Sequence, residues 1–192
     1  MRIVGGRHRG RPLGSPEGAD VRPTADRTRE SLFNILEHGK FSADGTSPLR
    51  GAFVLDVFAG TGALGFEALS RGAERLVAVD KAADAIACFR ANARTLGEVA
   101  RTTLFQCDAT KPPRPPAGPA GTPCSLVFLD PPYMSGLGPA YLSALAEAGW
   151  IAPGAICVLE VGKAEHGAAP KGFTILDERR YGKAKLVFLR FG

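Results

Sequence analysis

Acidic side chains lie at or near the ends of four apolar segments of the chain. Asp56 lies within AFVLDVF, Asp80 ends RLVAVD, Asp108 ends TTLFQCD and Asp130 ends SLVFLD. Open α/β sheets bind their ligands in a crevice outside the carboxyl ends of parallel strands. If the four segments are neighbouring parallel strands, their carboxylates should therefore line one binding crevice.

The first of these segments leads into a glycine-rich turn, FAGTGALG, in which Gly60, Gly62 and Gly65 have the spacing G-x-G-x-x-G. With Asp80 twenty residues after Gly60, the pattern fits a dinucleotide-binding loop, so an NAD enzyme is one interpretation. Asp56 favours another, because a carboxylate so close to the loop would repel cofactor phosphates. S-adenosylmethionine has no phosphate and carries an ammonium and a sulfonium, so an acid would attract it.

The other acids can be assigned to the same ligand. Asp80 would accept hydrogen bonds from the ribose hydroxyls, and Asp108 one from the adenine amino group. Lys81 and Ala109, which follow these two acids, are assigned to the same S-adenosylmethionine site. The alternative is that Asp56 and Asp108 only cap the turns that follow them. Three acids at three successive strand ends favour the ligand.

The fourth acid opens a rigid corner, Asp130-Pro131-Pro132-Tyr133. Prolines lack the backbone N–H and fix φ, so two in a row end the strand and hold the next atoms stiffly. The Asp130 carboxylate and the Pro131 carbonyl could then accept both hydrogens of an exocyclic amine and draw its nitrogen toward tetrahedral geometry. Tyr133 would stack on the base, and Asp130 could take up the released proton. The alternative is a plain surface turn.

These residues need a framework of strands and helices. Apolar strands are predicted at 52–58, 75–80, 102–108, 125–130 and 155–161, and a terminal antiparallel pair at 173–179 and 185–191. Helices are predicted at 63–72 and 138–150, and another on which Ile86, Phe89, Ala93 and Leu96 share a face. The pattern predicts a doubly wound α/β fold, with a seven-stranded, mostly parallel sheet covered by helices on both faces. The Pro/Gly segment 111–124 is predicted to be a surface loop.

The N-terminal 29 residues are strongly basic. They contain seven arginines against three acids, a formal charge of +4 in a chain of net charge +5. Arginine in preference to lysine favours phosphate recognition, although a solvated basic tail is the plainer interpretation. RIVGG and RGRPL suggest a small hairpin, and 22–38 a helix capped by Thr24 and ended by Gly39. The candidate RNA-binding residues are Arg2, Arg7, Arg9, Arg11, Arg22, Arg27 and Arg29.

The composition limits the remaining possibilities. A chain of 192 residues is one domain by default, and 45% hydrophobic with 22% charged residues is typical of a globular protein. The four cysteines are scattered among apolar segments, so we expect buried free thiols and no metal site. The N-terminal sequence has no apolar signal segment, and no stretch is long enough to span a membrane. We expect a soluble cytoplasmic protein.

Four motifs together resemble a known family. RIVGGRHRGRPL, VRPTADRTRESLFNIL, LDVFAGTGALGFEALSRGA and LDPPY occur in the order and spacing of the bacterial 16S rRNA (guanine(966)-N(2))-methyltransferase family, the RsmD type. The resemblance covers nearly the whole chain and is most specific in R-P-T-x-D-R-x-R-E-x-L-F-N. It implies a Rossmann-like fold with an antiparallel last strand, in a single domain over 1–192 with 1–21 as a basic hairpin extension.

The resemblance also implies an activity and a site. The activity is methylation of the 2-amino group of a guanine in small-subunit rRNA by S-adenosylmethionine, with the rRNA or the small ribosomal subunit as partner. We expect a monomer that binds neither DNA nor a membrane. The family's catalytic motif matches Asp130, Pro131, Pro132 and Tyr133, and its cofactor positions match Asp56, Gly60, Gly62, Asp80 and Asp108. The Pro/Gly segment 111–124 is longer and stiffer than the family loop we expect.

Two other functions stay open at this point. The first is methylation of the 6-amino group of adenine or of a protein amide, since the corner needs only a planar amine; such enzymes often have Asn in place of Asp130. The second is a non-catalytic RNA-binding factor of ribosome assembly, against which the intact Asp130, Pro131 and Tyr133 argue.

Overall fold

The computed structural model describes residues 1–15, 23–38, 41, 45–131, 137–163 and 169–192. Its α-helices are α1 (Pro23–His38), α2 (Ala63–Ser70), α3 (Ala83–Leu96) and α4 (Gly138–Ala148). Its strands are β1 (Phe53–Val57), β2 (Arg75–Asp80), β3 (Thr102–Gln106), β4 (Cys124–Leu129), β5 (Ile151–Gly162), β6 (Phe173–Tyr181) and β7 (Ala184–Phe191). Most predicted elements are therefore confirmed, with shifts of a few residues at their ends.

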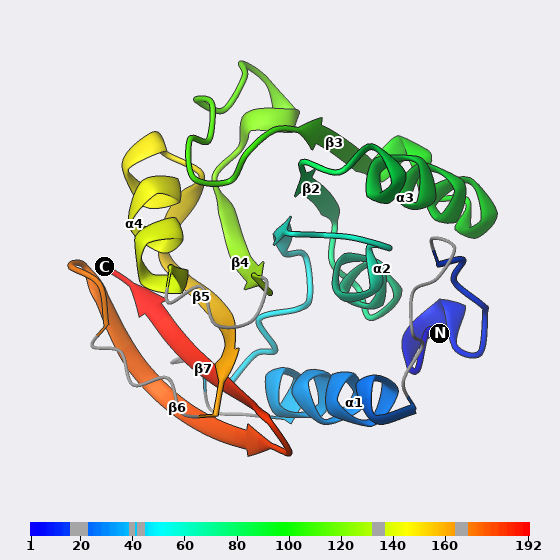
Figure 1. The fold of residues 1–192 in the computed structure, drawn as a ribbon, viewed down its shortest axis with the longest axis horizontal. Helices are drawn as coiled ribbons and strands as arrows, with labels where there is room; N and C mark the ends of the chain where they lie inside the picture. The colour runs from blue at the N-terminus through cyan, green and yellow to red at the C-terminus, as the bar shows by residue number, and fades with distance from the viewer. Residues whose placement is uncertain (16–22, 39–40, 42–44, 132–136, 164–168) are drawn as a thin grey trace.

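The strands form one seven-stranded sheet in the order β3-β2-β1-β4-β5-β7-β6 (Figure 1). Strands β1 to β5 are parallel, whereas β7 lies antiparallel between β5 and β6. This confirms the predicted mostly parallel sheet with its antiparallel terminal pair. The order reverses at β1, so the carboxyl ends of β1 and β4 border the crevice where such sheets bind ligands.

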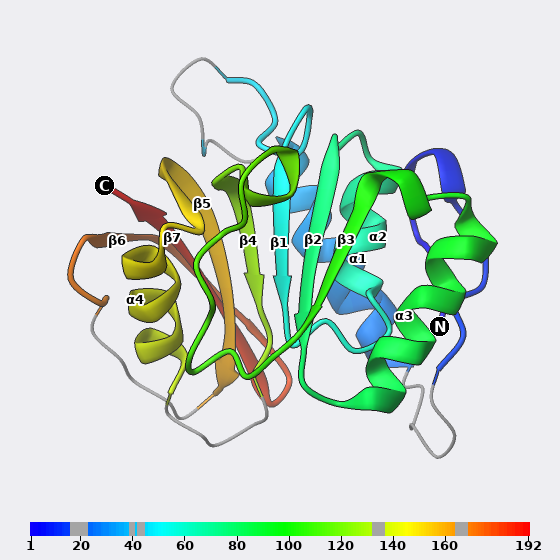
Figure 2. The ribbon, with the colours of Figure 1, turned by 90° about the horizontal axis from the view of Figure 1, so that it is seen from above.

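Side chains alternate along the strands and pack into two hydrophobic cores, one on each face of the sheet. One face packs against α1, α2 and α3, and its core includes Phe33, Phe66 and Phe128. The other packs against α4 and includes Leu142 and Trp150. Figure 2 shows the strands between α4, in front, and α1, behind them. The α3 residues Ile86, Phe89, Ala93 and Leu96 are all buried, which confirms the predicted apolar face.

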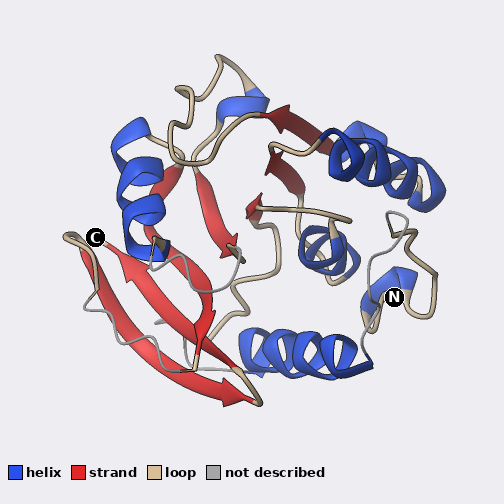
Figure 3. Ribbon diagram, viewed as in Figure 1, coloured by secondary structure: helices blue, strands red, loops and turns tan. Residues whose placement is uncertain are grey.

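Helices cover both faces of the sheet, as predicted, but in unequal number. Among the described residues, α4 is the one α-helix on its face, whereas α1, α2 and α3 cover the other. The loop between β3 and β4 lies on the side of α4 and contains only a short 3-10 helix, Pro119–Gly121 (Figure 3). The Trp150 indole Nε1 donates to the Pro113 carbonyl at 2.7 Å, and its ring meets Phe105 edge-on at 5.5 Å. The Pro/Gly loop thus covers part of the core beside α4.

The N-terminal arm, residues 1–14, forms the predicted hairpin. The Ile3 amide donates to Arg11 O at 3.0 Å, and the Gly10 amide donates to Ile3 O at 2.8 Å. Ile3 and Leu13 belong to the core beneath α1 and α2, so the arm is packed against the fold. Helix α1 begins at Pro23, and Thr24 is not its cap as predicted, because the fixed φ of proline suits a first helical turn. Gly39 lies outside the described residues.

The cysteines have no disulfide partners. Cys124 and Cys157 are buried, and desolvation raises the pKa of both thiols to about 12, whereas Cys88 and Cys107 are half-buried. The expectation of buried thiols is therefore met by two of the four. No helix in the described part of the chain combines the length and apolar character needed to cross a membrane.

Candidate active site

The glycine loop after β1 has a backbone that only certain residues adopt without strain. Phe58 has φ 63°, and Gly60 and Gly62 have φ 55° and 79°. Left-handed backbone favours glycine. A Cβ on Gly62 would also lie only 2.4 Å from Cε2 of Phe66. At Gly60 the nearest atom to such a Cβ would be Phe58 O at 4.0 Å, so the space above this residue is open.

Asp56 lies beneath this loop. Its Oδ2 atom accepts the Gly65 amide at 2.9 Å, and the residue is only 1% exposed. Desolvation raises the pKa of the carboxyl to about 8 despite the Gly65 hydrogen bond, and the charges of Asp130 and Asp80 raise it further. This is the geometry expected if Asp56 caps the turn that follows it. Asp56 is therefore neutral at pH 7, and its burial argues that it positions the loop and does not attract a cation directly.

Asp80 connects the glycine loop to the end of β2. Its Oδ2 accepts the Gly60 amide and its Oδ1 the Ala82 amide, both at 2.9 Å. Each carboxylate oxygen can accept a second hydrogen bond, so Asp80 can still receive hydroxyl groups. Lys81 beside it is exposed.

Asp108 lies at the end of the segment after β3. This segment is tied to β2, because the Cys107 amide donates to Asp80 O at 3.1 Å. Asp108 Oδ1 accepts the Thr110 amide and hydroxyl, and these hydrogen bonds lower the pKa of the exposed carboxyl. Within the described part of the chain, no side chain or amide donates a hydrogen bond to its other carboxylate oxygen. Ala109 is buried next to it. Gly60, Asp80 and Asp108 are thus brought to one edge of the sheet.

Asp130 follows β4 directly. Its amide meets Val57 O of β1 at 3.5 Å, so it lies beside the start of the glycine loop. The residue is exposed as a whole, but protein atoms around the carboxyl remove much of its hydration. This desolvation, with a further contribution from the charge of Glu160, raises the pKa of Asp130 to about 7. Pro131 is buried. Pro132 and Tyr133 lie outside the described residues.

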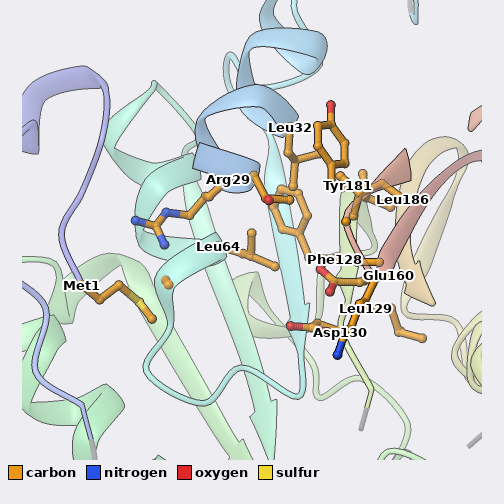
Figure 4. A pocket seen from close by; sticks show the side chains of 16 residues that line it. Met1, Arg29, Leu32, Leu64, Phe128, Leu129, Asp130, Glu160, Tyr181 and Leu186 are labelled. Atoms are coloured by element: carbon orange, nitrogen blue, oxygen red, sulfur yellow. The ribbon is translucent and has the colours of Figure 1, made fainter. Parts of the chain in front are cut away.

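Asp130 borders a pocket of about 440 Å³ on the α1 face of the sheet (Figure 4). Apolar walls come from Leu32 of α1, Leu64 of α2 and Leu186 of β7, and polar groups from Glu160 and Tyr181. The volume is within the range of about 300–1,000 Å³ found for small-molecule sites. The pocket thus offers an apolar space with carboxylates at one end.

Glu160 and Tyr181 are pocket residues that the sequence analysis did not identify. Glu160 is near the end of β5, in the segment AICVLEV, so it is one more acid at the carboxyl end of an apolar strand. The rule that singled out Asp130 would have found it. Tyr181 ends β6 and its hydroxyl lies 2.7 Å from Ser31 Oγ of α1, a pairing that no local sequence signal predicts.

The N-terminal arm reaches this site from the side of α2 and α3. The fully buried Glu67 carboxylate accepts the amides of Val4 and Gly5 at 2.8 Å and also pairs with Arg71. Asn92 of α3 accepts the Gly14 amide and donates to Thr61 O of the glycine loop. Met1 borders the pocket. The arm and the loop therefore form one connected structure.

The six predicted RNA-binding arginines that the structure describes divide into three groups. Arg2, Arg9 and Arg27 are exposed. Arg7 and Arg11 are exposed but already bonded, to Glu98 and to Thr95 O. The prediction for Arg29 needs correction, and Arg22 is outside the described residues.

Arg29 is only 5% exposed. It pairs with Asp26 at 2.9 Å and with Glu67 at 3.8 Å, and it donates to Arg2 O. In Figure 4 its guanidinium points away from Asp130 and Glu160. Arg29 thus joins α1 to the arm and is not placed to contact RNA.

Comparison with protein families finds a match over residues 1–190 to the family described as "Conserved hypothetical protein 95". The chain is 35% identical to "Ribosomal RNA small subunit methyltransferase D" of Escherichia coli K12, covering 95% of this chain and 86% of that protein. It is 32% identical to the Haemophilus influenzae protein of the same name, covering 95% and 89%.

Solved structures agree with these matches. The yhhF structure from Escherichia coli covers 100% of this chain and 97% of its own, with a TM-score of 0.80 and 30% identity. A ribosomal protein L11 methylase from Lactobacillus delbrueckii covers 95% and 84%, with a TM-score of 0.62. At 15% identity the second match is evidence for the fold alone. The sheet is the Rossmann-like sheet of methyltransferases, as predicted.

Proposed function

The chain belongs to the conserved hypothetical protein 95 family, and on that premise we propose that it methylates the 2-amino group of a guanine in 16S rRNA, with S-adenosylmethionine as the donor. Its named relatives are ribosomal RNA small subunit methyltransferases. The observation that carries the proposal is the Asp130 carboxyl, which borders an apolar pocket and lies next to the glycine loop.

The chemistry of the loop edge suits S-adenosylmethionine. Gly60 leaves open space above the loop, Asp80 keeps acceptor capacity for ribose hydroxyls, and Asp108 has a carboxylate oxygen for the adenine amino group. Gly62 shapes the turn, and Lys81 and Ala109 flank the two acids. Asp56 holds the loop from below through Gly65. Bound here, S-adenosylmethionine would supply an electrophilic methyl group on its sulfonium.

The catalytic residues act on the amine. The 2-amino nitrogen of guanine is a weak nucleophile, because its lone pair is delocalised into the ring. In our proposal the ionised Asp130 carboxylate and the Pro131 carbonyl each accept one N–H, which draws the nitrogen toward tetrahedral geometry. As the N–C bond forms and the methyl–sulfur bond breaks, Asp130 takes up the surplus amine proton. Pro132 would hold this corner rigid and Tyr133 would stack on the base; both roles remain predictions.

The exposed arginines of the arm and of α1 would contact phosphates of the rRNA, since phosphate contacts position a protein without reading sequence. We propose that Arg2, Arg9 and Arg27 contact the phosphates. Arg7 and Arg11 would add positive charge beside them. The substrate is then naked 16S rRNA or the small subunit, bound by a single copy of the chain. An NAD dehydrogenase is disfavoured, because its pyrophosphate on the glycine loop would lie close to the carboxylate of Asp130.

One labelling experiment tests the proposal. The protein is incubated with methyl-labelled S-adenosylmethionine and either naked 16S rRNA or assembled small subunits, and the labelled nucleoside is identified by digestion and mass spectrometry. We expect N2-methylguanosine at one position. Label in N6-methyladenosine would favour the adenine alternative, and binding of rRNA without label would favour a non-catalytic assembly factor.

A further inference from the structure

Glu160 and Asp130 are neighbours at the ends of adjacent strands. Leu129 of β4 is paired with Leu159 of β5 in the parallel register, so Asp130 and Glu160 come next on their strands. Leu129 and Leu159 pack into the α4 core, whereas Phe128 and Val158 pack into the opposite one. Because side chains alternate along a strand, Asp130 and Glu160 both point to the α1 face. Figure 4 shows the two carboxylates together in the pocket.

The pocket around them is suited to a flat aromatic group. Leu32, Leu64 and Leu186 contribute apolar side chains from three different elements, and Phe128 forms part of the wall beside Asp130. The carboxylates of Asp130 and Glu160 lie at the end where β4 and β5 terminate, whereas the Tyr181 hydroxyl lies on the side of α1. A base inserted here would bury its faces against apolar atoms and present one edge to the two acids.

Guanine and adenine differ at the atom next to the reacting amine. In guanine the 2-amino group adjoins N1–H, a second donor. In adenine the 6-amino group adjoins N1, which carries a lone pair and no hydrogen. Single-stranded RNA bases are commonly recognised by hydrogen bonds along this edge.

Resting on the function proposed above, we propose that Glu160 determines specificity: its carboxylate accepts the N1–H of the target guanine while Asp130 engages the neighbouring 2-amino group. The same carboxylate repels the bare N1 of adenine. A site built to hydrogen-bond a donor of the substrate discriminates strongly against the analogue that lacks this donor. Asp130 thus selects an amine, and Glu160 selects the base that carries it.

The test uses substrate in which the target guanine is replaced by 2-aminopurine. This base keeps the 2-amino group but has an unprotonated N1. Loss of a hydrogen bond to a charged group should reduce kcat/KM of the wild-type protein by about 10- to 100-fold on 2-aminopurine relative to guanine. In Glu160→Gln the amide can accept from N1–H or donate to N1, so the two bases should be methylated with similar kcat/KM. Glu160→Ala should lose the preference as well.

Two controls separate specificity from folding. Glu147→Gln makes the same charge change on the exposed side of α4 and should keep the wild-type preference. Thermal unfolding and S-adenosylmethionine binding show whether the Glu160 variants are folded. If folded Glu160 variants keep the wild-type ratio while the wild type methylates guanine, the inference is overturned and the proposed function stands. If the wild type methylates no guanine, both are overturned.

Discussion

The Oδ2 atom of Asp56 lies 2.9 Å from the amide nitrogen of Gly65, beneath the first turn of α2. The carboxyl is almost completely removed from solvent, and its pKa is raised to about 8. The group therefore keeps its proton at pH 7 in the folded protein but ionises in the unfolded chain. The link between the glycine loop and β1 consequently depends on pH.

Asp56→Asn should remove this dependence. Because the folded state holds a proton that the unfolded state releases, the contribution of Asp56 to stability is full below about pH 4 and falls as the pH rises toward 8. The wild type should lose about 1 kcal/mol per pH unit relative to Asp56→Asn across this window. Urea unfolding of both proteins at several pH values measures it. Parallel stability curves would mean that Asp56 is ionised in the folded state.

Asp130→Ala should reduce methylation by at least about 100-fold, since it removes the carboxylate that accepts an amine hydrogen and the proton. Binding of S-adenosylmethionine, measured by calorimetry, should be nearly unchanged, because its proposed contacts lie on the loops after β1, β2 and β3. Glu147→Ala, which removes a charge from exposed α4, should be fully active. Wild-type turnover in Asp130→Ala would refute the corner mechanism.

The pH dependence of kcat/KM should show ionisation of Asp130. With its pKa raised to about 7, the active carboxylate is lost below neutrality, so kcat/KM should rise with pH and level off above about 7. Glu160→Gln removes a neighbouring negative charge and should move this rise to lower pH, whatever its effect on the maximum. Asp56→Asn should keep the rise, which separates Asp130 from the other raised carboxyl. An identical midpoint in Glu160→Gln would contradict the coupling.

Much of the fold and part of the site could be predicted from the sequence. Apolar strands such as 75–80 and the glycine loop carry local signals, and strand ends in a parallel sheet meet at one edge, so Asp80, Asp108 and Asp130 could be placed together. The protonation of Asp56 could not be predicted from the sequence, because it depends on burial by residues that are distant in sequence. The same holds for Arg29, whose neighbours Glu67 and Arg2 O meet it only in the folded chain.

Exposed arginines of the arm should set the salt dependence of RNA binding. Removing residues 1–21 is not a clean test, because Ile3 and Leu13 belong to the core and Glu67 binds the amides of the arm. Arg2→Ala with Arg9→Ala removes exposed charge instead. The slope of log K against log salt should become shallower by about 0.7–0.9 for each phosphate that the double variant no longer binds.

Filter binding at several salt concentrations measures this slope. Arg114→Ala, in the Pro/Gly loop on the other face of the sheet, is the control. Equal slopes in the wild type and the double variant would exclude both arginines from the interface.

The Pro/Gly loop should contribute to stability through Trp150. The indole Nε1 donates to Pro113 O at 2.7 Å, and the ring packs against Phe105. Trp150→Phe keeps an aromatic ring but loses the donor, so the free energy of unfolding should fall by about 1–2 kcal/mol from the missing hydrogen bond and the smaller ring.

Methylation by Trp150→Phe should be unchanged, because the core beside α4 lies across the sheet from the pocket. Urea unfolding and a methylation assay on the same variant measure both. Unaltered stability would mean that this hydrogen bond does not hold the loop, whereas an inactive but folded variant would link the loop to the site.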